Sequence, residues 1–169
     1  MHTGTTTAAS TADPGDVDFL RRAIALSRTN MVASEGGPFG AVLVQDGRVV
    51  GEGWNRVTST NDPTAHAEVV AIRDACRALG TYQLTNATLY TSCEPCPMCL
   101  AAAYWARVER IVYAATREDA AEAGFDDAHI YGEVALPIAE RRLPMVCHLS
   151  DEARAVFGEW IEKADKIPY

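Results

Sequence analysis

Two short segments of the sequence carry side chains suited to binding a metal ion: His66-Ala67-Glu68 and Pro95-Cys96-Pro97-Met98-Cys99. Zinc binds imidazole nitrogen and thiolate sulfur well, and a zinc ion that takes part in a reaction keeps three protein ligands and one water. Cys96 and Cys99 are three positions apart, so on a helix they lie on one face, about one turn from each other. We therefore expect His66, Cys96 and Cys99 to bind Zn²⁺.

Glu68 adds the means to move protons beside that ion. It follows His66 by two positions, near enough to face a water on the metal without being a ligand. Zinc can lower the pKa of such a water to about 7, and a neighbouring carboxylate can then accept its proton and pass it to a substrate. The alternative is a closed zinc site that only stabilises the fold, with a fourth ligand from Cys93, Cys147 or a distant His. That alternative leaves Glu68 without a role.

The elements that must position these residues follow from hydrophobic periodicity and from turn signals. Helices are expected at 16–33, 65–79, 95–105, 117–124 and 151–164, and strands at 41–45, 48–54, 87–91, 109–114 and 143–149. Residues 125–131 are expected to be irregular. Helices that separate the later strands favour crossover connections and a sheet covered on both faces. The predicted fold is therefore α/β, a three-layer α/β/α sandwich with a mixed five-stranded sheet.

Length and composition limit the domain organisation and the compartment. A chain of 169 residues suits one domain, which we expect over 16–169, after a Thr- and Ala-rich disordered leader at 1–15. No apolar run approaches the roughly 20 residues of a membrane span. The five cysteines are an odd number, which favours unpaired thiols in a reducing cytoplasm over a secreted disulfide framework.

The charge balance argues against nucleic acid as a partner. The net charge is −8, because 23 acidic residues outnumber 15 basic ones. A protein that grips a phosphate backbone normally gathers Lys and Arg on one face, and the sequence has no basic run. A small molecule is the expected partner.

Four stretches carry a family resemblance that goes beyond the metal-binding residues. They are Gly36-Gly37-Pro38-Phe39-Gly40-Ala41, 61–68, 90–99 and Ala123-Gly124-Phe125-Asp126-Asp127. The order H-x-E…P-C-x-x-C is a signature of zinc deaminases, and the sequence resembles the cytidine deaminase superfamily, and more closely the bacterial guanine deaminases. The resemblance runs from about residue 18 to residue 169 and implies a cytidine deaminase-like fold.

The resemblance also implies roles for individual residues. Glu68 matches the proton shuttle, and His66, Cys96 and Cys99 match the zinc ligands. The residues expected to line or recognise the base are Phe39, Asn55, Ala67, Trp105 and Asp127. Tyr169 matches a residue that closes the neighbouring subunit's pocket in a domain-swapped homodimer, although Ile167-Pro168 before it is less typical.

Each of these residues also has a simpler interpretation. Phe39 and Trp105 could be core aromatics, and Asn55 could be a turn residue. Asp127 could be a loop carboxylate or a helix cap, and Tyr169 a frayed terminus. The remaining cysteines, Cys76, Cys93 and Cys147, are expected to be small buried hydrophobes.

The implied reaction is the zinc-dependent hydrolysis of guanine to xanthine and ammonia, a step of purine catabolism. A carboxylate at Asp127 would accept hydrogen bonds from the N1–H and the amine of guanine and would repel the N1 lone pair of adenine. The alternatives are deaminases of guanosine, of another nucleoside, or of an aminotriazine such as ammeline. Further alternatives are a tRNA adenosine deaminase and a zinc-stabilised module without catalysis.

Overall fold

The computed structural model describes residues 14–168, which fall into two compact units divided after Ala128. We call them the N-terminal unit and the C-terminal unit. Most of the predicted leader and the terminal Tyr169 lie outside the described residues; only Pro14 and Gly15 of the leader are described, and they open the first helix. None of the described helices is long and apolar enough to cross a membrane.

A mixed sheet forms the centre of the N-terminal unit. Its strands are β1 (Gly40–Gln45), β2 (Arg48–Trp54), β3 (Ala87–Cys93) and β4 (Arg110–Ala115), in the order β2-β1-β3-β4. β1 pairs antiparallel with both β2 and β3, whereas β3 and β4 are parallel. Asp46 and Gly47 connect the hairpin with φ values of 50° and 72°, as a two-residue turn with left-handed positions requires. The predicted mixed α/β sheet is confirmed in this unit.

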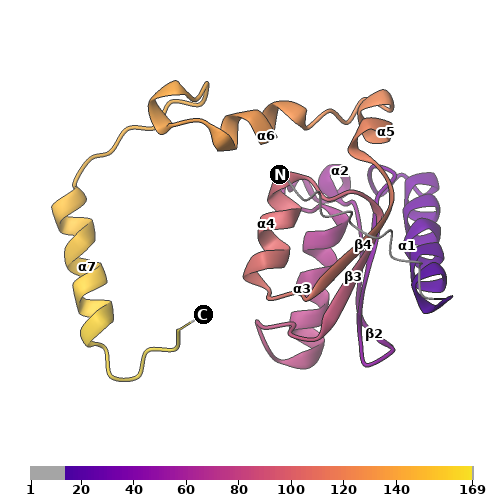
Figure 1. Cartoon of the computed structure of the whole chain (residues 1–169), viewed down its shortest axis with the longest axis horizontal. Helices are drawn as coiled ribbons and strands as arrows, with labels where there is room; N and C mark the ends of the chain where they lie inside the picture. The colour runs from indigo at the N-terminus through magenta and orange to yellow at the C-terminus, as the bar shows by residue number, and fades with distance from the viewer. Residues whose placement is uncertain (1–13, 169) are drawn as a thin grey trace, which may run out of the picture. The chain divides into compact units, whose positions relative to one another are not determined.

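Helices cover both faces of this sheet (Figure 1). α1 (Pro14–Val32) packs on one face, where Val42 and Tyr90 are buried. α3 (Ala67–Leu79) and α4 (Pro97–Trp105) pack on the other, over Leu43 and Leu89. Val42 and Leu43 take opposite faces because successive side chains of a strand alternate.

The start of α3 lies unusually close to the sheet. A Cβ atom at Gly53 of β2 would stand 2.2 Å from the carbonyl oxygen of Ala67, so only glycine permits this approach. The contact fixes the first turn of α3, and with it His66 and Glu68, against the end of β2.

A buried ionic group fixes the first turn of α1 to the same sheet. Asp16 is 4% exposed and accepts a hydrogen bond of 2.8 Å from the hydroxyl of Tyr90. The guanidinium of Arg110 donates to both carboxylate oxygens of Asp16, at 3.0 and 2.5 Å. Charge-assisted bidentate pairs of this kind are strong and directional, so α1 is held across β3 and β4.

The C-terminal unit contains α6 (Ala128–Ala135) except for its first residue, a 3₁₀ turn (Ile138–Glu140) and α7 (Ser150–Glu162). The prediction of a fifth strand at 143–149 is wrong, because these residues form no strand and pair with none of the described strands. A strand needs a partner edge to hydrogen bond with, and the described part of this unit supplies none. Residues 125–131 are also less irregular than expected, since α6 begins at Ala128. Cys147 is exposed rather than buried.

Candidate metal centre and adjoining pocket

Three donor groups meet where α3 and α4 begin. His66 is the N-cap residue of α3, Cys96 is the N-cap residue of α4, and Cys99 lies in the first turn of α4. The His66 Nδ1 atom is 3.6 Å from the Cys96 Sγ atom and 3.5 Å from the Cys99 Sγ atom. Bond lengths of about 2.0 Å to nitrogen and 2.3 Å to sulfur at tetrahedral angles place N and S about 3.5 Å apart. Both nitrogen–sulfur distances therefore match those of a tetrahedral zinc site.

The protonation of these groups also suits a cation. Cys99 donates a hydrogen bond to Cys96, and this bond, with a further one to His66, lowers the pKa of the Cys96 thiol to about 4. The same bond to Cys96 raises the pKa of Cys99, as does burial, and the pKa of His66 is raised chiefly by its bond to Cys96. Metal binding to thiols and imidazole releases their protons. A metal cation can therefore replace the protons that His66, Cys96 and Cys99 share.

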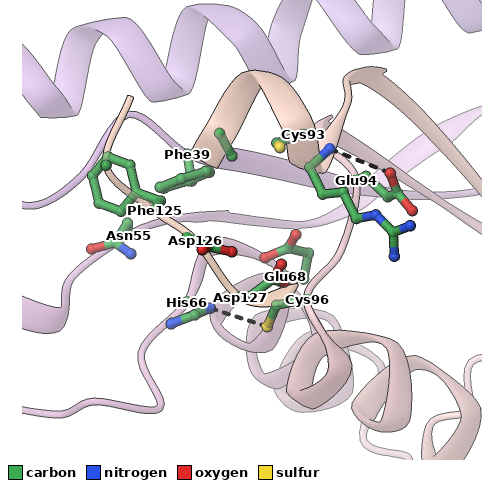
Figure 2. A pocket seen from close by; sticks show the side chains of 13 residues that line it. Phe39, Asn55, His66, Glu68, Cys93, Glu94, Cys96, Phe125, Asp126 and Asp127 are labelled. Carbon is green, nitrogen blue, oxygen red and sulfur yellow. Dashed lines mark hydrogen bonds between the residues drawn. The ribbon is translucent and has the colours of Figure 1, made fainter. Parts of the chain in front are cut away.

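Glu68 lies in the first turn of α3 and is 5% exposed. One of its carboxylate oxygens accepts a hydrogen bond of 3.0 Å from the hydroxyl of Thr91 in β3. Burial raises the pKa of Glu68, against the lowering effect of its bonds to its own backbone, Cys99 and Thr91. Figure 2 shows the Glu68 side chain in the same pocket as His66 and Cys96.

A cavity of about 260 Å³ opens beside the donor group. Phe39 and Phe125 line it as an edge-to-face pair, with ring centroids 4.9 Å apart and an interplanar angle of 87°. Asn55, Glu68 and Asp127 supply polar groups to the same cavity. Aromatic side chains with a few polar groups suit a flat heteroaromatic ring.

Asn55 is held firmly by the loops around it. Its side-chain oxygen accepts hydrogen bonds from the backbone N–H groups of Gly37 and Val57, both at 3.2 Å. A Cβ atom at Gly36 would stand 2.2 Å from the Asn55 carbonyl oxygen, so this loop too requires glycine. Because the side-chain oxygen is occupied, the amide nitrogen is the group that Asn55 can offer to a bound molecule.

Asp127 brings a second carboxylate to the cavity and is half-buried. Burial and the charge of the Cys96 thiolate raise the pKa of Asp127. The preceding residue, Asp126, accepts a hydrogen bond of 2.9 Å from the N–H of Ala128. This bond closes a tight turn at the end of the stretch that lines the cavity. Asp127 is therefore one of the charged groups that line the cavity.

The cavity does not include every residue expected at the base. Trp105 ends α4 with 65% of its surface exposed and does not line the cavity. Ala67 is fully buried against the sheet and does not line it either. Tyr169 lies outside the described residues. Trp105 and Ala67 belong to the helices that hold the donors, and their contact with a base stays a prediction.

The structure adds residues to the cavity that the sequence did not single out, chiefly Glu94, Arg117, Phe125 and Asp126. Glu94 directly precedes the Pro-Cys-x-x-Cys run, and Phe125 and Asp126 lie in a stretch that carries the family resemblance, so signals for these three existed. Arg117 had none. Cys93 is buried as expected, but it also lines the cavity.

Comparison with known proteins agrees with this geometry. Residues 14–115 match the cytidine and deoxycytidylate deaminase zinc-binding region, and the chain belongs to this family of zinc-binding deaminases. The chain is 54% identical to the guanine deaminase of Bacillus subtilis (strain 168) over 151 residues. This aligned region covers 89% of this chain and 97% of that protein.

The X-ray structure of the Bacillus subtilis guanine deaminase is similar over nearly the whole chain. The TM-score is 0.88 at 54% sequence identity, over 90% of this chain and 98% of that one. The tRNA-specific adenosine deaminase of Agrobacterium fabrum is also 54% identical, but over 78 residues that make up 46% of this chain and 51% of that protein. The tRNA-specific adenosine deaminase of Aquifex aeolicus (strain VF5) is 32% identical over 126 residues, which make up 75% of this chain and 81% of that protein.

Proposed function

We propose that this protein hydrolyses guanine to xanthine and ammonia with a zinc ion bound by His66, Cys96 and Cys99. The observation that carries the proposal is the 54% identity to a guanine deaminase over 89% of this chain and 97% of that one. The two tRNA deaminases match either about half of this chain at 54% identity or 75% of it at 32% identity. The acidic net charge of −8 also disfavours a polyanionic substrate.

In the proposed reaction, the zinc ion would lower the pKa of a water molecule to about 7 and so supply hydroxide at neutral pH. Glu68 would accept one proton of that water and deliver it to the ring nitrogen N3 as the water oxygen bonds to C2. It would then take the remaining proton of that oxygen and deliver it to the departing amine. The bond between C2 and the amine breaks, a C2 carbonyl forms, and ammonia leaves. Thr91 donates a hydrogen bond to one oxygen of Glu68 and so orients its carboxyl group.

In this proposal, the side chains that line the cavity around the metal centre select the base. Asp127 accepts hydrogen bonds from the N1–H and amine edge of guanine, and Asn55 donates through its side-chain nitrogen. Phe39 and Phe125, which contact each other edge to face, supply aromatic surface beside the ring. Adenine would set its N1 lone pair against the Asp127 carboxylate, and this mismatch disfavours it.

A spectrophotometric panel of guanine, guanosine, adenine, cytosine and ammeline tests the proposal. We expect kcat/KM for guanine to exceed that for every other compound by about 10²-fold or more, because unpaired polar groups penalise the wrong bases. A chelator should abolish the activity and added zinc should restore it. Comparable turnover of guanosine or ammeline would redefine the substrate, and tRNA binding that weakens steeply with salt would favour the tRNA enzymes.

We further propose that both units belong to one deaminase domain that works as a homodimer in the cytoplasm. The C-terminal unit has no buried residue in its three described helical segments. It exposes large apolar side chains, among them Leu143, Val146, Phe157 and Ile161. In the N-terminal unit, Tyr104 and Trp105 are also largely exposed.

Exposed apolar surfaces of this extent mark an interface, and a second copy of the chain is the commonest partner. The family resemblance implies that the tails are exchanged, with Tyr169 reaching the partner's pocket. Free cysteines at 76, 93, 96, 99 and 147 support a reducing compartment.

Sedimentation equilibrium tests the dimer. We expect a species of twice the 18.2 kDa chain mass for the native protein at micromolar concentration. Replacing Phe157 and Ile161 together by Asp should give monomers, because charged groups are costly in an apolar interface. The exposed Glu162→Ala variant is the control and should remain dimeric. A native protein that sediments as a monomer would refute this part of the proposal.

A further inference from the structure

Glu94 lies at the end of β3, beside the metal-binding run but outside the donor group, and its side chain lines the cavity. One of its carboxylate oxygens accepts a hydrogen bond of 3.3 Å from the backbone N–H of Arg117, drawn as a dashed line in Figure 2. Arg117 is the first residue of α5 (Arg117–Glu122). The first N–H groups of a helix have no partner within the helix, so Glu94 supplies one from a different element.

Two more hydrogen bonds join the same two segments. The N–H of Glu94 donates to the carbonyl of Ala115 at 2.9 Å, and the thiol of Cys93 donates to the carbonyl of Thr116 at 3.4 Å. They extend the parallel pairing of β3 and β4, in which Cys93 lies opposite Ala115. The end of β3 therefore fixes the junction from which α5 departs.

α5 connects this junction directly to the pocket. The helix ends at Glu122, and the chain then turns through Gly124, whose φ is +93°. The N–H of Phe125 donates back to the carbonyl of Ala120 at 2.9 Å, which ties the turn to the helix. Phe125 and Asp127 then enter the cavity. A displacement of the first turn of α5 would therefore carry Asp127 with it.

We propose that Glu94 is a positioning residue for base recognition: by holding the start of α5, it sets where Asp127 meets the substrate. This inference rests on the proposed function, because it takes Asp127 as the group that recognises guanine. Glu94 holds α5 through its side-chain oxygen, which accepts the hydrogen bond from Arg117, and its negative charge is not required for this role. Misplacement of a recognition group by about 1 Å can cost about 10²-fold, so one anchoring bond can have a measurable effect.

Three variants separate positioning from a charge effect. Glu94→Ala removes the acceptor, Glu94→Gln keeps an acceptor without the charge, and Glu118→Ala removes an exposed carboxylate that pairs with the Arg117 side chain. We expect Glu94→Ala to raise KM for guanine about 10-fold with little change in kcat, the pattern of a loss in binding. Zinc content should stay at the native level. Glu94→Gln and Glu118→Ala should stay within about twofold of the native KM.

A double-mutant cycle with Asp127→Ala tests whether Glu94 acts through Asp127. In the Asp127→Ala background, Glu94→Ala should have no further effect on KM. Independent effects in the two positions would overturn the proposal. So would a Glu94→Gln variant as impaired as Glu94→Ala, which would point to charge.

Hydrogen exchange of the Arg117 amide supplies a readout that does not depend on activity. In Glu94→Ala this amide should exchange about 10-fold faster, since its bond has been removed, while Glu94→Gln keeps it protected. Unchanged exchange in Glu94→Ala would overturn the proposal for Glu94 whatever Asp127 does. An Asp127→Ala variant with native guanine turnover would instead refute the part of the proposed function in which Asp127 recognises guanine.

Discussion

The Glu68→Gln variant is expected to keep its zinc and to lose about 10³-fold in kcat for guanine, within the range reported for removal of a general acid–base group. Glutamine has the shape of glutamate and can still accept the hydrogen bond that Thr91 donates. It cannot take up a proton and release it at the ring nitrogen and the amine. The loss should therefore fall on kcat and leave KM within about threefold of the native value.

Xanthine formation measured by absorbance, together with zinc content by atomic emission, checks this expectation. Glu109→Gln, an exposed change next to β4, is the matched control and should behave like the native protein. Because burial already disfavours the ionised form of Glu68, the neutral amide is expected to leave Tm unchanged or to raise it. A Glu68→Gln variant that kept more than about a tenth of the native kcat would rule out Glu68 as the proton carrier, given the 10²-fold minimum expected.

The metal-donor group could be predicted because its geometry is local. Cys96 and Cys99 are separated by two residues, so the first turn of one helix is enough to bring both sulfurs together. His66 is positioned by the start of the preceding long helix, α3. The strands of the N-terminal unit were predicted nearly to the residue, β2 at Arg48–Trp54 included, because alternation and the Asp46-Gly47 turn are local signals as well.

The failures concern contacts between distant parts of the chain. The segment 143–149 has the apolar residues of a strand, but a strand exists only where another edge pairs with it, and that edge is not encoded locally. Glu94 and Arg117 are 23 positions apart, and no periodicity links them. The role of Trp105 at the base stays a prediction, because what meets its exposed side chain at the end of α4 depends on another part of the chain or on a partner.

The Asp127→Ala variant is expected to lower kcat/KM for guanine by about 10²-fold, because a hydrogen bond to a charged group contributes about 1.5–3 kcal/mol and its loss leaves guanine donors unpaired. Zinc content should not change, since Asp127 lies outside the group of His66, Cys96 and Cys99. Asp127→Asn should be impaired as well, because the amide offers one acceptor oxygen where the carboxylate offers two. Asp18→Ala, an exposed change on α1, is the control.

A comparison of guanine with 1-methylguanine isolates the hydrogen bond from general damage to the pocket. The methyl group removes the N1–H donor and meets the Asp127 carboxylate directly, so the native protein should prefer guanine by about 10²-fold or more, as sites built to bond a donor do. Asp127→Ala removes both the acceptor and the obstruction, and the preference should shrink to a few-fold even though overall turnover has fallen. If the preference survives in Asp127→Ala, another group reads the N1 edge of the base, and the carboxylate contributes only to the shape of the cavity.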